Sequence, residues 1–213
     1  MKILHIVPSA FEYFGEIRER AFDLIEGLSE LGFDNYVFTL QYGTVTKRFQ
    51  KEVAAKTGGG LGFEKIHGPQ EIDEKMEQAD IIHLHAPFLG LGRKLLIFKT
   101  KHPEKKIIVS LYRNLPYTDL FTIIIWMYNN WYLKKLVNLA DYVCAEDEQI
   151  LKSFGGSNML KDLNKFISLT NFINFINETN PSLAEEAQGL TLSGPQLQSC
   201  LAYGEIYRML SGD

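Results

Sequence analysis

Cysteine is scarce in this sequence, and so are the features of membrane-spanning and nucleic-acid-binding proteins. The 213 residues include two cysteines, Cys144 and Cys200, and a chain without a disulfide framework fits a reducing, cytoplasmic setting. No stretch dense in lysine and arginine offsets the net charge of −4, which argues against a dedicated nucleic-acid-binding protein. The apolar run at residues 3–7 is too short for a secretory signal peptide and ends at a proline.

Sequence motifs of the well-known nucleotide-binding and hydrolytic sites are also missing. No G-x-G-x-x-G follows the first apolar run, no G-x-x-x-x-G-K-[ST] loop occurs, and no G-x-S-x-G elbow is present. A self-sufficient enzyme or nucleotide-binding protein on one Rossmann-like domain is therefore the weakest of the functions considered, and we expect no cofactor.

Apolar runs alternate with helical patterns along most of the chain. After the run at residues 3–7, residues 8–14 form a break, and from Glu16 apolar residues recur at helical spacing until Gly32. Further strands are predicted at residues 36–40, 63–66, 80–85, 107–111, 141–145 and 166–170, and helices at 44–56, 69–78, 93–101, 119–139 and 146–154. This alternation predicts a Rossmann-like α/β fold: a doubly wound, mostly parallel sheet of about six to seven strands with helices on both faces.

The character of the sequence changes near its last forty residues. Residues 1–175 carry the alternating pattern and are expected to form one domain. Residues 176–194 contain Pro181, Gly189 and Gly194 among small polar residues and are interpreted as a linker. Residues 195–213 predict a final helix that has Pro195 near its start and packs back on the same domain.

Four segments, taken together in their order, carry a family resemblance. They are ILHIVP at residues 3–8, FGEIR at 14–18, ADIIHLHAP at 79–87 and ADYVCAEDE at 140–148. Together they resemble the N-terminal, acceptor-side domain of the GT-B retaining glycosyltransferases, group one (glycosyltransferase family 4). KFISLTNFIN at 165–174 resembles the segment that leads into the second domain of this family, and YGEIYRML at 203–210 resembles the helix that returns from it.

The resemblance implies half of a GT-B fold. Family members are nearly twice as long, because a second Rossmann-like domain binds the nucleotide-sugar donor, whereas here about twenty residues join the crossover segment to the return helix. It implies the acceptor-binding half of a hexosyltransferase that needs a separate nucleotide-sugar-binding subunit and acts on a carbohydrate or lipid-linked acceptor. The alternative is a catalytically inactive, glycosyltransferase-derived module that dimerises, and we assign no catalytic residue.

The loop after the first strand contributes four candidate cleft residues: Pro8, Gly15, Glu16 and Arg18. In the family this loop carries a Gly-Gly pair, so that the backbone can approach the donor diphosphate at a helix N-terminus. Here Glu16 takes the second position, where a carboxylate would repel a diphosphate by roughly 1–4 kcal/mol per charge pair. The other interpretation is that Glu16 is a first-turn acid that complements the helix dipole.

Histidines mark the end of the strand at residues 80–85. His83 and His85 alternate with Leu84, so they share one face of the strand. His85, nearer the carboxyl end, is expected to face the cleft, and the other interpretation is a pair of buried, hydrogen-bonded histidines. Because no acidic or cysteine partner lies close by in the sequence, no metal site is expected.

Three more candidates follow later strands. The resemblance places Tyr112 where the family has a histidine close to the transferring sugar; a tyrosine titrates near 10 and cannot do the same proton transfer at neutral pH. Arg113 either binds an anionic group or lies at the surface. Asp147 belongs either to the cleft or to a helix cap, where an acid complements the dipole.

Residues 120–132 are unusually apolar and aromatic and are followed by Lys134 and Lys135. The stretch is too short to span a bilayer. Three interpretations stay open: a peripheral contact with the inner face of the membrane, where tryptophan, tyrosine and lysine are favoured, a dimer face, or a core helix.

Overall fold

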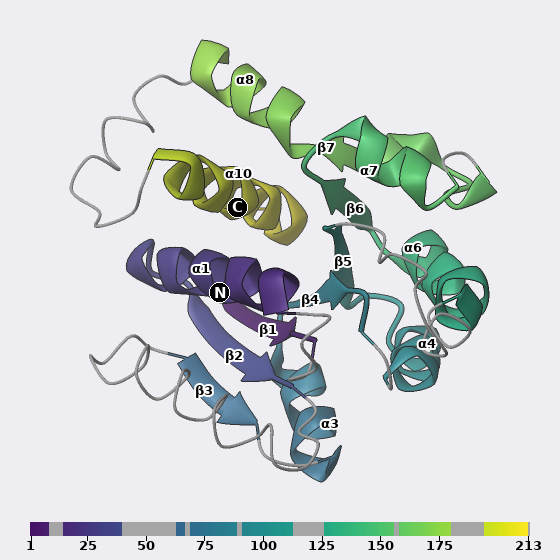
Figure 1. The fold of residues 1–213 in the computed structure, drawn as a ribbon. Coiled ribbons are helices and arrows are strands. Elements are labelled where there is room, and N and C mark those ends of the chain that lie inside the picture. Colours follow the sequence, from purple (N-terminus) through teal and green to yellow (C-terminus); the bar gives the residue numbers. More distant parts are fainter. Residues whose placement is uncertain are drawn as a thin grey trace.

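Seven parallel strands form the centre of the molecule (Figure 1). The computed structural model describes residues 1–8, 15–39, 63–66, 69–88, 91–112, 126–155, 158–179 and 194–212. The strand order within these residues is β3-β2-β1-β4-β5-β6-β7, and every neighbouring pair is parallel. The strands are β1 (Lys2–Ile6), β2 (Asp34–Phe38), β3 (Phe63–Ile66), β4 (Ile81–Ala86), β5 (Lys106–Leu111), β6 (Tyr142–Ala145) and β7 (Phe166–Ser168). This arrangement confirms the predicted Rossmann-like α/β fold.

Helices connect the strands and cover both faces of the sheet (Figure 1). They are α1 (Gly15–Glu30), α3 (Pro69–Gln78), α4 (Gly92–Lys101), the π-helix η2 (Tyr128–Leu133), α6 (Lys134–Leu139), α7 (Glu148–Ser153), the 3-10 helix η4 (Leu163–Lys165), α8 (Leu169–Thr179) and α10 (Gly194–Ser211). Within the described part of the chain, no helix has both the length and the apolar character needed to cross a lipid bilayer.

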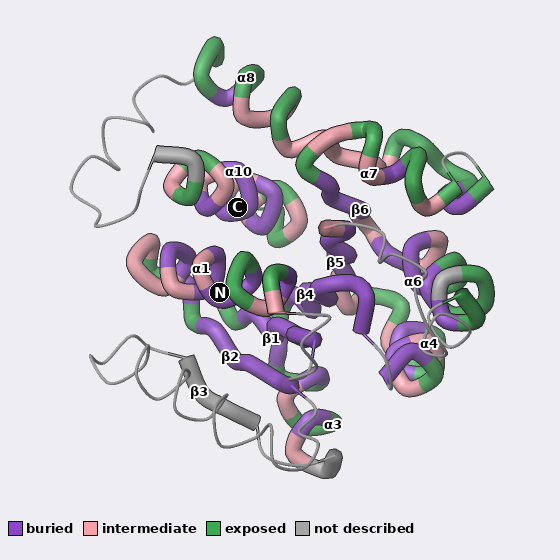
Figure 2. Tube along the Cα trace, in the orientation of Figure 1, coloured by how far each residue is buried: buried purple, intermediate pink, exposed green. Residues whose placement is uncertain are grey.

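Side chains of the central strands alternate between two hydrophobic cores. Along β1, Leu4 and Ile6 belong to the larger core, which α3, α4, α6 and α7 cover, whereas Ile3 belongs to the core under α1 and α10. Figure 2 shows the central strands buried along their length and the exposed residues on the outer faces of the helices. Burial on both faces explains why these strands appear in the sequence as continuous apolar runs.

The last helix, α10, lies beside α1 although the two are far apart in the sequence (Figure 1). Four of its buried residues, Cys200, Tyr203, Ile206 and Tyr207, recur at spacings of three or four and so form one face. They share a core with Ile108 and other residues of the central strands. The helix therefore completes one side of the main domain.

Several predicted boundaries differ from the structure. The strand predicted at residues 166–170 ends at Ser168, and the helix α8 that follows continues to Thr179, so residues 176–179 are helical and not part of a linker. The physical reason is that Phe and Ile pairs recur every three residues from Phe172 to Ile176, which gives α8 an apolar face. Of the helix predicted at 119–139, the described part begins with α-helical residues at 126–127 and continues as the π-helix η2. The helix predicted at 44–56 and residues 180–193 lie outside the described residues.

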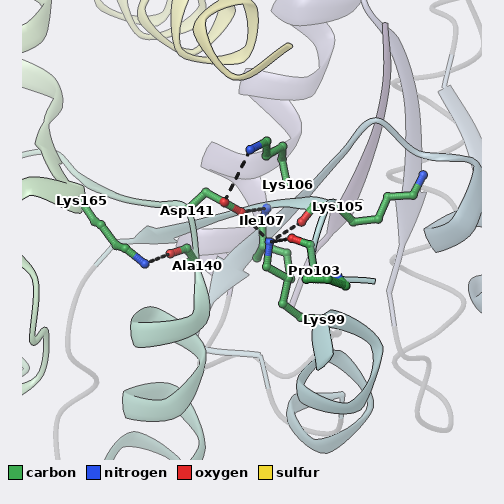
Figure 3. Close-up of polar contacts among 8 residues, drawn as sticks. All are labelled: Lys99, Pro103, Lys105, Lys106, Ile107, Ala140, Asp141 and Lys165. Carbon is green, nitrogen blue, oxygen red and sulfur yellow. Dashed lines mark hydrogen bonds and ion pairs between the residues drawn. The ribbon is translucent and has the colours of Figure 1, made fainter. Parts of the chain in front are cut away.

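A buried lysine ties the amino-terminal ends of β5 and β6 together (Figure 3). The ammonium group of Lys99, a residue 8% exposed, donates to Oδ2 of Asp141 at 3.0 Å and to the carbonyl oxygens of Pro103 at 3.0 Å and Lys105 at 2.5 Å. The same carboxylate oxygen accepts the backbone N–H of Ile107 at 2.8 Å. The ion pair therefore joins α4 to the start of β5 and to the residue before β6.

Candidate functional site

A row of polar side chains crosses the sheet on the face that α1 and α10 cover. Parallel pairing places His5 of β1 opposite His83 of β4, and His85 opposite Ser110 of β5. All three histidines are fully buried, and the rings of His83 and His85 stack with their centroids 4.1 Å apart. The prediction that His83 and His85 share one face is confirmed, and the fold adds His5 as a neighbour.

Hydrogen bonds link Asn35, His5, His85 and Tyr112 into one chain. The amide nitrogen of Asn35 donates to Oγ of Ser29 at 2.8 Å, so its oxygen faces His5 and accepts from Nε2–H at 3.0 Å. We assign the tautomers from these partners: His5 Nδ1 accepts from Nε2–H of His85 at 3.1 Å, and His85 Nδ1 accepts from the Tyr112 hydroxyl at 2.7 Å. Every donor in this chain points the same way, from Tyr112 towards Asn35.

A second chain of hydrogen bonds joins the sheet to α10. The two ring nitrogens of His83 pair with the Tyr207 hydroxyl at 2.5 Å and with Oγ of Ser110 at 2.6 Å. Ser110 in turn pairs with the Tyr203 hydroxyl at 2.5 Å. Two tyrosines of α10 thereby satisfy polar groups that the sheet would otherwise bury without partners.

Burial fixes the protonation states of both chains. Loss of hydration lowers the pKa of His5 to about 3, against the partly compensating hydrogen bond that His5 donates to Asn35, and lowers the pKa of His83 and His85 well below the usual value of 6.5. The same loss of hydration raises the pKa of Tyr112, Tyr203 and Tyr207. At neutral pH the histidines are therefore uncharged and the tyrosines protonated.

The three histidines also meet one geometric requirement of a metal site. Their nearest ring nitrogens lie within 4.8 Å of one another, which sequence distance alone did not indicate, because β1 supplies the third imidazole. However, all six ring nitrogens already have a hydrogen-bond partner in the protein. Coordination would break at least one of these bonds for each histidine, so the arrangement fits a hydrogen-bonded network better than a ligand set.

A cavity of about 410 Å³ lies where these chains reach the carboxyl ends of β5 and β6. Residues of both strand ends, of α1, of α8 and of α10 line it, among them Arg20, Tyr112, Glu146, Thr170 and Tyr203. In parallel α/β sheets, ligands bind beyond the carboxyl ends of the strands. The cavity therefore lies at the edge where a ligand site is expected.

Arg20 connects the two sides of this cavity. Its guanidinium lies 3.1 Å from a carboxylate oxygen of Glu146, which follows β6, and 3.3 Å from one of Glu16 in the preceding turn of α1. About half of the Arg20 side chain is exposed. Glu16 is thus the i,i+4 partner of a cation on its own helix, in addition to its favourable place in the first turn.

The first-loop candidates are placed as follows. Pro8 is buried and its carbonyl oxygen accepts a hydrogen bond of 3.4 Å from the Thr39 hydroxyl, while Gly15 begins α1. Arg18 is half-buried and does not belong to the described residues that line the cavity. Arg20, two residues further along α1, lines the cavity where Arg18 was expected.

The later candidates have different outcomes. Tyr112 lines the cavity, whereas His85 is fully buried and reaches it only through the Tyr112 hydroxyl, which corrects the expectation that His85 faces the cleft. Asp147 is the N-cap of α7, because its carboxylate accepts the backbone N–H of Ile150 at 3.0 Å. Arg113 lies outside the described residues.

Arg20, Glu146 and His5 are the site residues that sequence reasoning missed. A signal for His5 was present: it stands in the first apolar run, and register with the neighbouring parallel strand would place it beside His83. No comparable signal marked Arg20, because its relation to Glu146 depends on how α1 lies across the sheet.

Comparison with known proteins found no protein-family model that matches this chain and no curated protein with a significant match.

Proposed function

We propose that this chain is the acceptor-binding half of a GT-B glycosyltransferase and that the cavity beyond β5 and β6 holds the carbohydrate part of the acceptor. The observation that carries the proposal is the polar and aromatic cavity at the carboxyl edge of the parallel sheet. Its volume of about 410 Å³ lies within the range of small-molecule sites.

The lining chemistry supports a carbohydrate as ligand. Sugar hydroxyl groups need donors and acceptors around them, which Arg20, Glu146 and Gln196 can supply, and the apolar face of a sugar ring packs against aromatic rings such as Tyr112. Because Tyr112 is held by His85, its hydroxyl position is fixed before a ligand binds. A fixed side chain loses little conformational entropy on binding.

The charges of the cavity support the proposal of a separate donor-binding subunit. Among its described lining residues, Asp23 and Glu146 carry two negative charges against the one positive charge of Arg20, and Glu16 is a second acid beside that arginine. A nucleoside diphosphate would meet net repulsion there. The sugar-nucleotide site of the enzyme would then belong to another chain.

Calorimetry on the isolated chain tests this proposal. Titration with a panel of methyl glycosides and disaccharides is expected to show binding that Arg20→Gln weakens at least fivefold, because the variant removes a charged donor from the cavity. Arg208→Gln is the matched control, since Arg208 also pairs with a glutamate, Glu205, but does not belong to the described lining residues. The proposal would be contradicted if both variants bound the glycosides equally strongly. It would also be contradicted if the chain bound nucleotide sugars tightly and glycosides not at all.

A second candidate is the catalytically inactive, dimerising module. One observation favours it: burial keeps Tyr112 protonated and His85 uncharged at neutral pH, so neither group at this end of the sheet is poised for proton transfer. Phe175 of α8 is 58% exposed and Leu163 is 56% exposed, which leaves apolar side chains for an interface. Sedimentation equilibrium distinguishes the two: a dimer that Phe175→Ser dissociates favours the module, and a monomer at every concentration counts against it.

A further inference from the structure

Exposed apolar side chains, most of them aromatic, gather on η2 and on the two helical residues before it. Trp126 is 50% exposed, Met127 37%, Trp131 55% and Tyr132 40%. Trp126 and Trp131 are the only tryptophans of the sequence. Large apolar side chains that lie together at the surface of a soluble domain indicate an interaction surface.

The π-helical backbone explains why these rings face outward. Tyr128 and Leu133, five residues apart, are both buried, and the Tyr128 hydroxyl accepts the backbone N–H of Phe88 at 3.1 Å. In an α-helix, residue 132 would share the face of residue 128; the wider π-turn gives that place to Leu133 and turns Tyr132 outward. The Tyr132 ring lies over Gly92, where an added β-carbon would be 3.1 Å from it, so the ring is fixed by packing.

Three lysines lie beside two of these rings. A cavity of about 560 Å³ at this surface is lined by Trp131 and Tyr132 together with Lys134, Lys135 and Lys161. All three lysines are exposed, and no carboxylate lines the cavity among the residues that the structure describes. The charge here is opposite in sign to the net charge of −4 of the whole chain.

We propose that the surface formed by Trp126, Trp131, Tyr132, Lys134, Lys135 and Lys161, the aromatic-lysine surface, binds anionic phospholipid membranes from one side. Tryptophan and tyrosine prefer the boundary between headgroups and acyl chains, and lysine is attracted to anionic headgroups. The combination distinguishes a lipid surface from a protein partner, because interfaces between proteins are depleted in lysine. The cavity among the lysines would receive a headgroup phosphate.

Tryptophan fluorescence tests the proposal directly, because both tryptophans belong to this surface. Vesicles of phosphatidylcholine with phosphatidylglycerol are expected to shift the emission to shorter wavelength, and vesicles of phosphatidylcholine alone to shift it much less. The variant Lys134→Gln/Lys135→Gln should lower the vesicle partition coefficient about 25-fold, since each lysine near an anionic surface contributes about fivefold. Trp131→Ser should lower it several-fold in a co-sedimentation assay.

Two control variants match these changes elsewhere on the molecule. Lys2→Gln/Lys152→Gln removes the same charge from two other exposed lysines, and Met209→Ser removes another large exposed apolar side chain. Both are expected to keep the vesicle binding of the unmodified chain. The proposal is overturned if anionic vesicles cause no blue shift, if the controls lose binding as much as the test variants, or if Trp131→Ser instead dissociates a dimer in vesicle-free buffer.

Discussion

Among single residues, the fully buried histidines should make the stability of the fold depend on pH. The unfolded chain binds protons at histidine near pH 6.5, whereas the folded chain binds them only at much lower pH, since burial lowers the pKa of His5, His83 and His85. Below pH 6.5 the unfolded state therefore holds more protons, and the free energy of unfolding must decrease as pH falls.

We expect the free energy of unfolding to be constant above about pH 7 and to decrease between pH 6.5 and 5. The loss is up to about 1.4 kcal/mol per pH unit for each of the three histidines. Urea unfolding at pH 7.5, 6.0 and 5.0 measures it, and His5→Gln should reduce the slope by about one third. Stability that does not change between pH 7.5 and 5.0 would show that the histidines are not buried as described.

Removal of the Tyr207 hydroxyl tests the hydrogen bond between α10 and the sheet. Tyr207→Phe keeps the ring in the core but leaves a nitrogen of the buried His83 without its partner, which should cost about 1–3 kcal/mol of unfolding free energy. Tyr132→Phe is the control. Because Tyr132 is 40% exposed, removal of its hydroxyl group should lower the free energy of unfolding by less than about 0.5 kcal/mol. Equal effects in chemical denaturation would contradict the buried network.

At the scale of secondary-structure elements, the ion pair in Figure 3 fixes how α4 meets β5 and β6. Lys99 is buried beside Asp141 and bonds to two carbonyl oxygens besides. Asp141→Ala leaves the ammonium group without its counter-charge, and loss of one partner of such a pair costs about 3–5 kcal/mol. Lys99→Met in the same chain removes the stranded charge and should restore much of that loss.

A double-mutant cycle on this pair separates its coupling from the effects of each side chain. We expect Asp141→Ala/Lys99→Met to be more stable than Asp141→Ala alone, in urea unfolding at pH 7.5. If the double variant loses as much unfolding free energy as the two single variants together, the lysine and the carboxylate are not coupled.

Some elements were predicted together with their ends, and others were missed. The strand at Phe63–Ile66 and the helix at Pro69–Gln78 have the predicted bounds, because apolar period and turn residues specify them locally. Helix α8 was not predicted, since the Asn residues between its Phe and Ile pairs resemble a polar break until the residues are placed on a helix. At η2 the chain forms a π-helix in place of an α-helix because Tyr128 and Leu133 are both buried there. No local sequence pattern predicts this packing.

At the scale of the whole molecule, the parallel sheet could be predicted from the alternation of strands and helices, whereas the candidate site could be predicted only in part. Tyr112 at the end of β5 was a candidate because the family resemblance points to that position, and the structure places it in the cavity lining. Arg20 and Glu146 lie 126 positions apart in the sequence and meet only in the folded chain. Sites assembled from distant segments require the tertiary arrangement, and the helix α10 that closes this cavity comes from the far end of the chain.

The central claim is that this chain by itself holds the acceptor and not the activated donor. Crystals soaked in a mixture of a methyl glycoside and a nucleotide sugar test it in one diffraction measurement. The account predicts electron density for the glycoside in the cavity against Tyr112 and Glu146, and none for a nucleotide on this chain. Density for the nucleotide sugar beside α1, with the cavity lacking the glycoside, would contradict it.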